Sequence, residues 1–414
     1  MPYTLLAITE QSGNYLTNYP VEIILDSSWN GWNANPTKDS IYITDYNGNP
    51  LYYWIEVFDT TNKKLVIHTK IPSLPANSTI KIKLYYAETN PYPSYNNGNQ
   101  VFDFFDEFRV ETSLDPNKWT TYETANSITF TSDGINITKT SGFAGICTLN
   151  TIDFSTLKKI IITKKVNAGD KWNTALYIIP TLPSSGDPYN QNDWFADFQG
   201  TFGDAIRLDK KINGTEGEVK RVQPIDPTIF HRHKLKLKIT SSGIVIWDLD
   251  YSNVYRNTSE TLFSTSTNYI ILGVSADTGY TRTITAQYIA IGQAVDPEPQ
   301  VTIATEITSP SINDIATSLL SSPTINDIVT SMLSSPTIND VVTSILSSPA
   351  INDIITSVLS SPSIIDIITP SITQPSIQLL SIELIVNMFL LILIPIIIIL
   401  LIEMIFSAIK ELLD

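Results

Sequence analysis

Apolar and polar positions alternate with a period of two along the first hundred residues. Such alternation is typical of β-strands with one buried face. Turn-forming residues separate the alternating runs, as in the segment Asn47-Gly48-Asn49-Pro50. The predicted strands fall at residues 21–25, 41–44, 51–57, 64–68 and 80–86. We therefore predict a β-sandwich over residues 1–102.

The same region resembles a known domain family. The segments SGNYLTNYPVEIILD, LYYWIEVFD, IPSLPANSTIKIKLYYA and VFDFFDEF follow one another over about 105 residues. Together they are similar to an uncharacterised β-sandwich family that is common in predicted archaeal and bacterial surface proteins. The resemblance implies a surface module and no mechanism, because that family has no established catalytic residues.

Residues 103–297 resemble a concanavalin A-like jelly roll, the fold of laminin G domains, lectins and glucanases. The segments that carry the likeness are FDFFDEF…LDPNKW, HKLKLKITSSGIVIWDLD and NYIILGVSADTG…AQYIAIG. The motif Glu-x-Asp-x-x-Glu of the glucanases in that family is absent from the sequence. Some members of the fold carry a structural calcium, but the sequence identifies no ligand set for one. We expect a mainly β fold and no other cofactor.

The pattern changes from strand-like to helical between residues 298 and 381. Repeats of thirteen residues place prolines at 310, 323, 336, 349 and 362, as in SPTINDIVTSMLS. In that unit Ile325, Ile328, Val329 and Met332 lie on one helical face, and Pro323 suits the first helical position. Such short helices are unstable alone, so we predict a homo-oligomeric stalk, with a trimer as the first hypothesis. The alternative is a disordered, O-glycosylated stalk.

A long apolar run follows the repeats. Residues 384–402 contain no formal charge and are long enough to cross a bilayer as a helix, although Asn387 and Pro395 interrupt them. Glu403 ends the run, and Lys410 is the only basic residue beyond it. We predict a transmembrane helix within residues 382–406 and an internal tail at 407–414. The alternative is a buried core helix.

Composition narrows the possible partners and compartments. The net charge is −15, and only 16% of residues are charged, so no basic cluster exists that could bind nucleic acid. Cys147 is the single cysteine, which rules out an intramolecular disulfide. The segment MPYTLLAITE lacks the basic and long apolar regions of a signal peptide. We therefore expect the C-terminal span to direct membrane insertion.

Aromatic and acidic residues offer candidate binding positions. Exposed tryptophans can stack on sugars, and we single out Trp29, Trp32 and Trp194 for this role. Asp193 and Asp197, in the segment NDWFADFQG, are candidate ligand contacts and the nearest approach to the paired carboxylates of a retaining glycosidase. Asp103, Asp106 and Glu107 form a second acidic group that we expect to cap or to face solvent. We predict that the protein is not an enzyme.

Two further patterns concern metals and glycans. In the segment His231-Arg232-His233 both imidazoles fall on one side of a strand, as in a metal-binding pair. No third ligand lies nearby, so we expect two partly exposed histidines and no metal site. N-glycosylation sequons begin at Asn77, Asn136, Asn213 and Asn257.

These features together predict a non-enzymatic spike with its N-terminal head outside a membrane and its C-terminus inside. We expect it to serve host or glycan recognition as a virion structural glycoprotein of an archaeal virus. Two alternatives stay open: a membrane-anchored S-layer stalk or cell-surface adhesin of an archaeon, and a tethered glycoside hydrolase. The expected partners are other copies of the chain, the lipid membrane, and a glycan or host receptor, a capsid or an S-layer protein.

Overall fold

The computed structural model describes residues 2–123, 127–167, 174–200 and 205–304. Residues Met1–Glu306 form one compact unit. The predicted stalk and span, with Asn387, Pro395 and Glu403, lie outside the described residues. Within the described part, no helix is both long and apolar enough to span a bilayer. The short helices there are η1 (Asn30–Ala34), η2 (Lys38–Ser40), η3 (Pro93–Tyr95), α1 (Gly98–Val101) and η4 (Pro188–Asn190).

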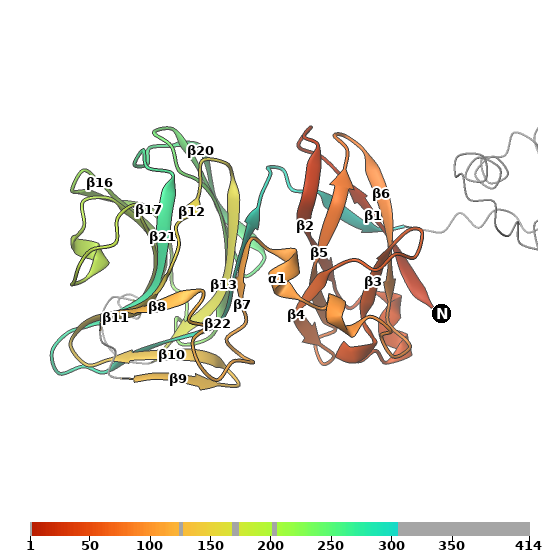
Figure 1. Cartoon of the computed structure of the whole chain (residues 1–414), viewed down its shortest axis with the longest axis horizontal. Helices are drawn as coiled ribbons and strands as arrows, with labels where there is room; N and C mark the ends of the chain where they lie inside the picture. The colour runs from red at the N-terminus through yellow and green to blue at the C-terminus, as the bar shows by residue number, and fades with distance from the viewer. Residues whose placement is uncertain (1, 124–126, 168–173, 201–204, 305–414) are drawn as a thin grey trace, which may run out of the picture. The chain divides into compact units, whose positions relative to one another are not determined.

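The prediction of a mainly β fold is confirmed, and the strands form two sandwiches (Figure 1). The first sandwich packs a four-stranded sheet on a three-stranded one. The larger sheet has the order β23 (Gln300–Ile303), β1 (Tyr3–Thr9), β6 (Thr79–Tyr85) and β3 (Tyr42–Asp45). The smaller has the order β2 (Leu16–Leu25), β5 (Lys64–Leu74) and β4 (Tyr53–Asp59).

Strand β23 comes from a part of the chain that we expected in the stalk. It pairs antiparallel with β1, in a register that sets Leu6 opposite Ile303 and Thr9 opposite Gln300. The chain therefore returns to the first sandwich after completing the second. Gln300–Ile303 adds a strand to the open edge of the larger sheet, beside β1.

The second sandwich consists of two antiparallel sheets, each with eight strands. We call them the inner sheet, which faces the first sandwich, and the outer sheet. The inner sheet contains β20 (Ser252–Glu260), β19 (Gly243–Leu249), β18 (His231–Lys238), β13 (Lys158–Val166), β22 (Arg282–Gln293), β10 (Gly134–Lys139), β9 (Ser127–Thr131) and β7 (Phe104–Asp106). The outer sheet contains β17 (Thr215–Val222), β16 (Ala205–Ile212), β15 (Trp194–Gly200), β14 (Thr174–Ile179), β21 (Thr267–Ala276), β11 (Gly142–Thr148), β8 (Trp119–Tyr122) and β12 (Ile152–Asp153).

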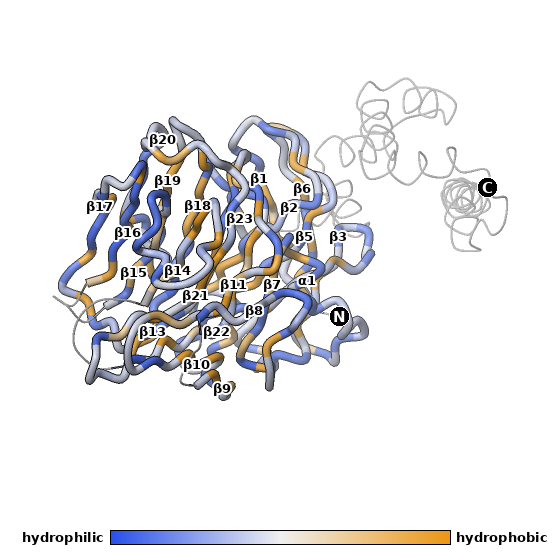
Figure 2. The backbone as a smooth tube through the Cα atoms, turned by 60° about the vertical axis from the view of Figure 1, so that its left-hand side comes forward, coloured by the Kyte–Doolittle hydropathy of each residue, from blue (hydrophilic) through white to orange (hydrophobic). Residues whose placement is uncertain are grey.

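The main core lies between these two sheets. Alternate side chains of each strand enter it, which explains the alternation of hydropathy along the backbone (Figure 2). Ile160 and Ile162 from β13 meet Leu176 and Ile178 from β14 there, and all four are almost completely buried. Burial of such side chains contributes about 1.5–3 kcal/mol each. The result is a jelly-roll-like sandwich.

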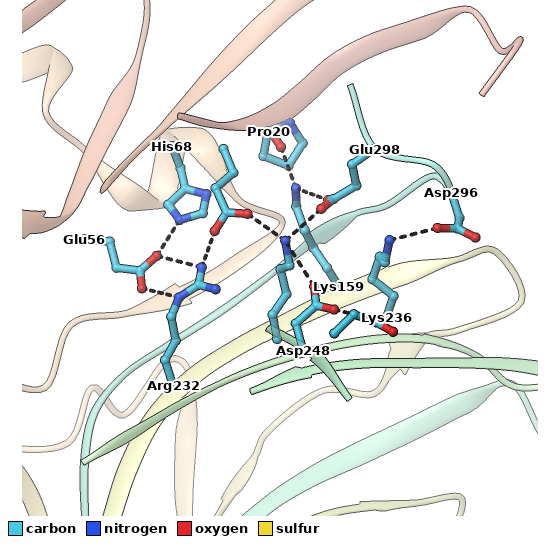
Figure 3. A network of polar contacts seen from close by, with 12 residues as sticks. Pro20, Glu56, His68, Lys159, Arg232, Lys236, Asp248, Asp296 and Glu298 are labelled. Carbon is cyan, nitrogen blue, oxygen red and sulfur yellow. Dashed lines mark hydrogen bonds and ion pairs between the residues drawn. The ribbon is translucent and has the colours of Figure 1, made fainter. Parts of the chain in front are cut away.

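The other face of the inner sheet packs against β4 and β5 of the first sandwich. Trp54 lies at the centre of this interface, with its ring 4.8 Å from that of Tyr288 and 4.9 Å from that of Phe105. Beside this apolar cluster lies a network of buried charges (Figure 3). Arg232 pairs with Glu22 and Glu56 of the first sandwich. The two sandwiches are therefore joined by both apolar and ionic contacts.

Candidate functional site

The outer sheet carries aromatic side chains on the face that points away from the core. Strand β15 places Phe195, Asp197 and Gln199 inside, so that Trp194 and Phe198 fall on the outer face. Tyr177 on β14 packs against both of these rings, with centroid distances of 6.1 and 5.5 Å. Aromatic residues are enriched in strands because their rings pack well on a pleated, half-buried surface.

A connection between β14 and β15 covers the aromatic face. Tyr122 donates a hydrogen bond to the carbonyl of Gly186 at 2.7 Å, and the amide of Gly186 donates to Glu123 at 2.6 Å. Asp187 caps η4 by accepting a hydrogen bond from the amide of Tyr189. These bonds hold the connection over the sheet and leave a pocket beside it.

The pocket has a volume of about 430 Å³, which falls in the usual range of ligand sites, roughly 300–1,000 Å³. Strands β14 to β17 and the η4 connection form its walls. The lining residues are Tyr177, Asp187, Tyr189, Trp194, Arg207, Asp209, Glu216, Gly217 and Glu218. The pocket thus combines three aromatic rings with four carboxylates and one guanidinium.

Asp209 is the most perturbed acid of this pocket. Its side chain is nine-tenths buried, and Oδ2 lies 2.9 Å from Nη2 of Arg207. Oδ1 is buried and has no hydrogen-bond partner among the described residues. Burial raises the pKa of Asp209 to about 6, although Arg207 opposes the shift. A buried acceptor without a donor costs about 1–3 kcal/mol, so a ligand hydroxyl or ammonium that donates to Oδ1 would relieve this cost.

Tyr189 and Trp194 form the aromatic wall of the pocket. Their ring centroids are 5.3 Å apart, and the indole of Trp194 donates to the carbonyl of Tyr189 at 3.0 Å. The hydroxyl of Tyr189 donates to Glu216. Trp194 is only 1% exposed, so it supports the wall from beneath while Tyr189 presents its half-buried ring. The expectation that Trp194 is an exposed stacking residue was therefore wrong, although its indole lies behind the pocket wall.

Trp29 and Trp32 occupy a different place from the one expected. Both lie in the core of the first sandwich, 2% and 7% exposed, with their rings 5.1 Å apart. Their indole nitrogens donate to Thr4 and to the carbonyl of Asp26. The expectation that they are exposed was wrong, because the loop that contains them folds inward as η1.

Asp193 and Asp197 do not form a carboxylate pair. Asp193 accepts a hydrogen bond from the amide of Asn213 at 2.7 Å and thereby joins two loops. Asp197 points to the opposite side, into the core between the sheets, where it is 2% exposed. There it contacts Lys164 and His233. Neither residue lines the pocket, although their segment leads into it.

The two histidines of β18 are structural, and the metal pair considered from the sequence is not formed. His231 contacts Asp250 at 2.6 Å and the carbonyl of Asp226 at 2.7 Å, which occupies both ring nitrogens. His233 contacts Asp197 at 2.8 Å through Nδ1. Both are buried rather than partly exposed, because the strand lies at the centre of the inner sheet.

Glu22, Glu56 and His68 bring their ligand atoms within 4.8 Å of one another, as in a metal site. The guanidinium of Arg232 lies among them, however, and contacts both carboxylates. Arg232 and His68 hold the pKa of Glu56 far below its ordinary value in spite of its burial. The guanidinium therefore supplies the positive charge that a metal ion would bring.

A second pocket lies where the chain passes from one sandwich to the other. Its volume is about 510 Å³, and Asp106, Glu107 and Glu111 are among its lining residues. Asp106 is fully buried and accepts hydrogen bonds from Lys118 at 2.8 Å and from the indole of Trp119 at 2.6 Å. It was expected to cap or to face solvent, but it holds the first strands of the second sandwich together.

The four sequons differ in accessibility. Asn77 and Asn213 are exposed in turns with positive φ. Asn136 accepts a hydrogen bond from Thr285 at 2.6 Å, and Asn257 donates to Glu260 at 2.8 Å. The first two positions therefore offer free amides for a glycan, whereas the other two are engaged in strands.

Sequence comparison matches part of the chain to a family. Residues 38–122 match the family described as Domain of unknown function (DUF2341). The matched segment begins within the first sandwich and extends to β8 of the second. The likeness to an uncharacterised domain family is thereby confirmed from residue 38 onward, and the match runs beyond the expected end near residue 105. No curated protein matches the chain.

Solved structures that are similar in fold cover a little less than half of this chain. A carbohydrate binding module CBM66 from Bacillus subtilis is 14% identical, with a TM-score of 0.33, and covers 44% of this chain and 100% of its own. A β-glucanase of Bacillus licheniformis is 12% identical, with a TM-score of 0.33, and covers 46% of this chain and 98% of its own. The Emp47p carbohydrate recognition domain is 10% identical, with a TM-score of 0.35, and covers 47% and 96%.

Sequence reasoning missed most of the pocket. Arg207 and Asp209 lie two apart on β16 and Glu216 and Glu218 two apart on β17, which is the spacing of side chains on one face. This alternation was visible in the sequence. The alternation alone did not indicate a pocket, because Tyr189, which forms the aromatic wall, comes from the connection between β14 and β15.

Proposed function

We propose that the second sandwich binds a neutral glycan in the pocket formed by Tyr189, Trp194, Arg207, Asp209 and Glu216. The observation that carries the proposal is the unpartnered, buried Oδ1 of Asp209 beside an aromatic wall. Sugars complement both features, because their hydroxyls donate hydrogen bonds to acceptors and their C–H faces pack on aromatic rings.

The charge of the pocket favours a neutral ligand over an anionic one. Four carboxylates line it against one guanidinium, and Arg207 is already paired with Asp209. An uronate or sulfated sugar would meet like charges at close range, which disfavours binding. An amino sugar would be tolerated, because its ammonium could donate to Asp209.

The test is a binding survey of the whole chain against neutral glucans, mannans and galactans, with a polyuronate as the anionic comparison. We expect binding to at least one neutral polysaccharide and none to the polyuronate. Asp209→Asn should weaken that binding by about tenfold or more, because it replaces a charged hydrogen-bond acceptor with a neutral amide. Asp133→Asn, an exposed carboxylate outside the pocket, should leave binding unchanged.

In this proposal, the C-terminal part of the chain holds the glycan-binding sandwich away from a membrane. The apolar run at residues 384–402 would anchor the protein in a membrane, and the thirteen-residue repeats would associate as a stalk. This arrangement suits host attachment by an archaeal virus or adhesion at an archaeal cell surface. Membrane extraction of the full chain, followed by mass measurement of the oligomer, tests it; a protein recovered without detergent contradicts the anchor.

Hydrolysis is the second candidate function. Asp209, with a pKa raised to about 6 by burial, has the character of a general acid, and Glu216 and Glu218 lie on the adjacent strand. We propose binding without turnover. If the parent releases reducing sugar from a bound polysaccharide and Asp209→Asn does not, the protein is a glycosidase and this proposal is wrong.

A further inference from the structure

Three ionisable side chains meet in the core of the second sandwich, apart from the pocket. Lys164 on β13 and His233 on β18 belong to the inner sheet, and Asp197 on β15 belongs to the outer sheet. The side chains are 0%, 1% and 2% exposed for Lys164, His233 and Asp197 respectively. The glycan proposal uses none of them.

The contacts of Lys164 are poor for a buried ammonium. Its Nζ lies 3.2 Å from the carbonyl oxygen of Asp197 and 3.5 Å from Oδ1 of the same residue. An ammonium has three hydrogens to donate, and a buried ion pair is stable only when its geometry and hydrogen bonding are good. Burial lowers the pKa of Lys164 although Asp197 opposes the shift.

Lys159, on the same strand, is a buried lysine whose ammonium is well hydrogen-bonded. Its Nζ donates to the carbonyl of Pro20 at 2.6 Å and to Glu298 at 2.9 Å. Both bonds are short, and Glu298 also contacts Lys234. The contrast indicates that the long contacts of Lys164 are a property of its site, not of buried lysines in this protein.

We infer that Lys164 and Asp197 form an intramolecular isopeptide bond that links the two sheets of the second sandwich. Nζ lies next to the carboxyl group that it would attack, in a site closed to solvent. His233 contacts the other carboxylate oxygen, Oδ2, at 2.8 Å through Nδ1. Amine, carboxyl group and proton carrier are therefore together in the folded chain.

The reaction needs no outside reagent. A proton passes from the Lys164 ammonium to the Asp197 carboxylate, which gives an amine and a carboxylic acid. Nζ then attacks Cγ, and a new C–N bond forms as one C–O bond breaks. Oδ2 leaves as water and takes up the proton released from nitrogen, and Nδ1 of His233, 2.8 Å from Oδ2, is close enough to relay this proton. One amide and one water replace one ammonium and one carboxylate.

Two features favour the amide over the ion pair. Proximity replaces a bimolecular encounter with an intramolecular one, which is worth many orders of magnitude in effective concentration. The product also removes two buried charges and their desolvation cost. The bond would connect residues 33 positions apart, a cross-link for which the single cysteine of the chain offers no disulfide equivalent.

The experiment is intact-mass measurement of the full chain, produced in a host that adds no N-glycans and corrected for removal of Met1. We expect a mass one water below that of the sequence, and a protease digest that contains one branched peptide joining Lys164 to Asp197. Lys164→Met should restore the full mass. Lys165→Met, which changes the half-buried neighbour that pairs with Asp133, should keep the water loss.

A second variant guards against a misfolded Lys164→Met protein. Asp197→Asn would form the same amide by losing ammonia, so its mass should equal that of the cross-linked parent. A parent with its full sequence mass would overturn the inference. So would a water loss that persists in Lys164→Met, since this would place the dehydration elsewhere.

Discussion

Arg232 of the second sandwich forms a buried ion pair with Glu56 of the first. Their side chains are 5% and 0% exposed, and Tyr288 donates a hydrogen bond to the same carboxylate at 2.6 Å. The pair joins strands that are 176 residues apart in the chain. The pair thus helps to hold the two sandwiches together in one compact unit.

Removing one member of this pair should destabilise the protein strongly. Glu56→Gln leaves Arg232 with its charge only partly compensated, which typically costs about 3–5 kcal/mol in the free energy of unfolding. Denaturant unfolding of the full chain measures the change. Glu88→Gln, the same substitution at an exposed position, should stay within about 0.5 kcal/mol of the parent. Equal stabilities for the two variants would contradict a structural role for the pair.

Zinc should not bind at Glu22, Glu56 and His68 in the parent protein, because Arg232 occupies the space between them. In Arg232→Ala the three ligands lose that cation and remain near one another. We therefore expect zinc to raise the Tm of Arg232→Ala and to leave that of the parent unchanged. A zinc-dependent shift in the parent would show that the cluster is a metal site.

Glu111 should make the free energy of unfolding fall as the pH rises from about 4.5 to about 8. Burial, followed by the neighbouring Asp106 carboxylate, raises the pKa of Glu111 from 4.5 to about 8. A raised pKa contributes stability below pH 4.5, where both states bind the proton, and this contribution is lost as the pH rises through about 8. Glu111→Gln should flatten the decline, whereas Glu88→Gln should not. Parallel pH profiles for parent and Glu111→Gln would count against the shift.

Binding should depend on the ionisation of Asp209. A ligand hydroxyl donates to the carboxylate form, and the pKa of this group is raised to about 6 by burial. Glycan affinity should therefore increase as the pH rises through about 6 and should level off above it. Asp209→Asn should abolish this dependence. Titration calorimetry across this range provides the measurement, and a pH-independent affinity in the parent would exclude Asp209 from the site.

The sequence predicted the first sandwich well, because its strands alternate clearly. The predicted strand at residues 64–68 begins at the first residue of β5 (Lys64–Leu74), and that at 21–25 ends at the last residue of β2 (Leu16–Leu25). It did not predict β23, since a four-residue strand beyond the second sandwich has no local signal for its distant partner β1.

The candidate site was harder to predict than the fold. Trp29, Trp32 and Trp194 were all expected to be exposed, and all three are buried, although Trp194 lines the pocket. Local sequence does not distinguish a loop that folds inward from one that stays exposed. Asp197 was identified as an acid and proved to face the core, because its side of β15 depends on where the strand begins.

The most direct test of the account is the affinity of the full chain for a neutral polysaccharide, measured in parallel for the parent, Asp209→Asn and Asp133→Asn at a pH above 6. We expect the parent and Asp133→Asn to bind, and Asp209→Asn to lose about tenfold or more in affinity. Absence of binding to all neutral glucans, mannans and galactans, or equal affinities for all three proteins, would contradict it.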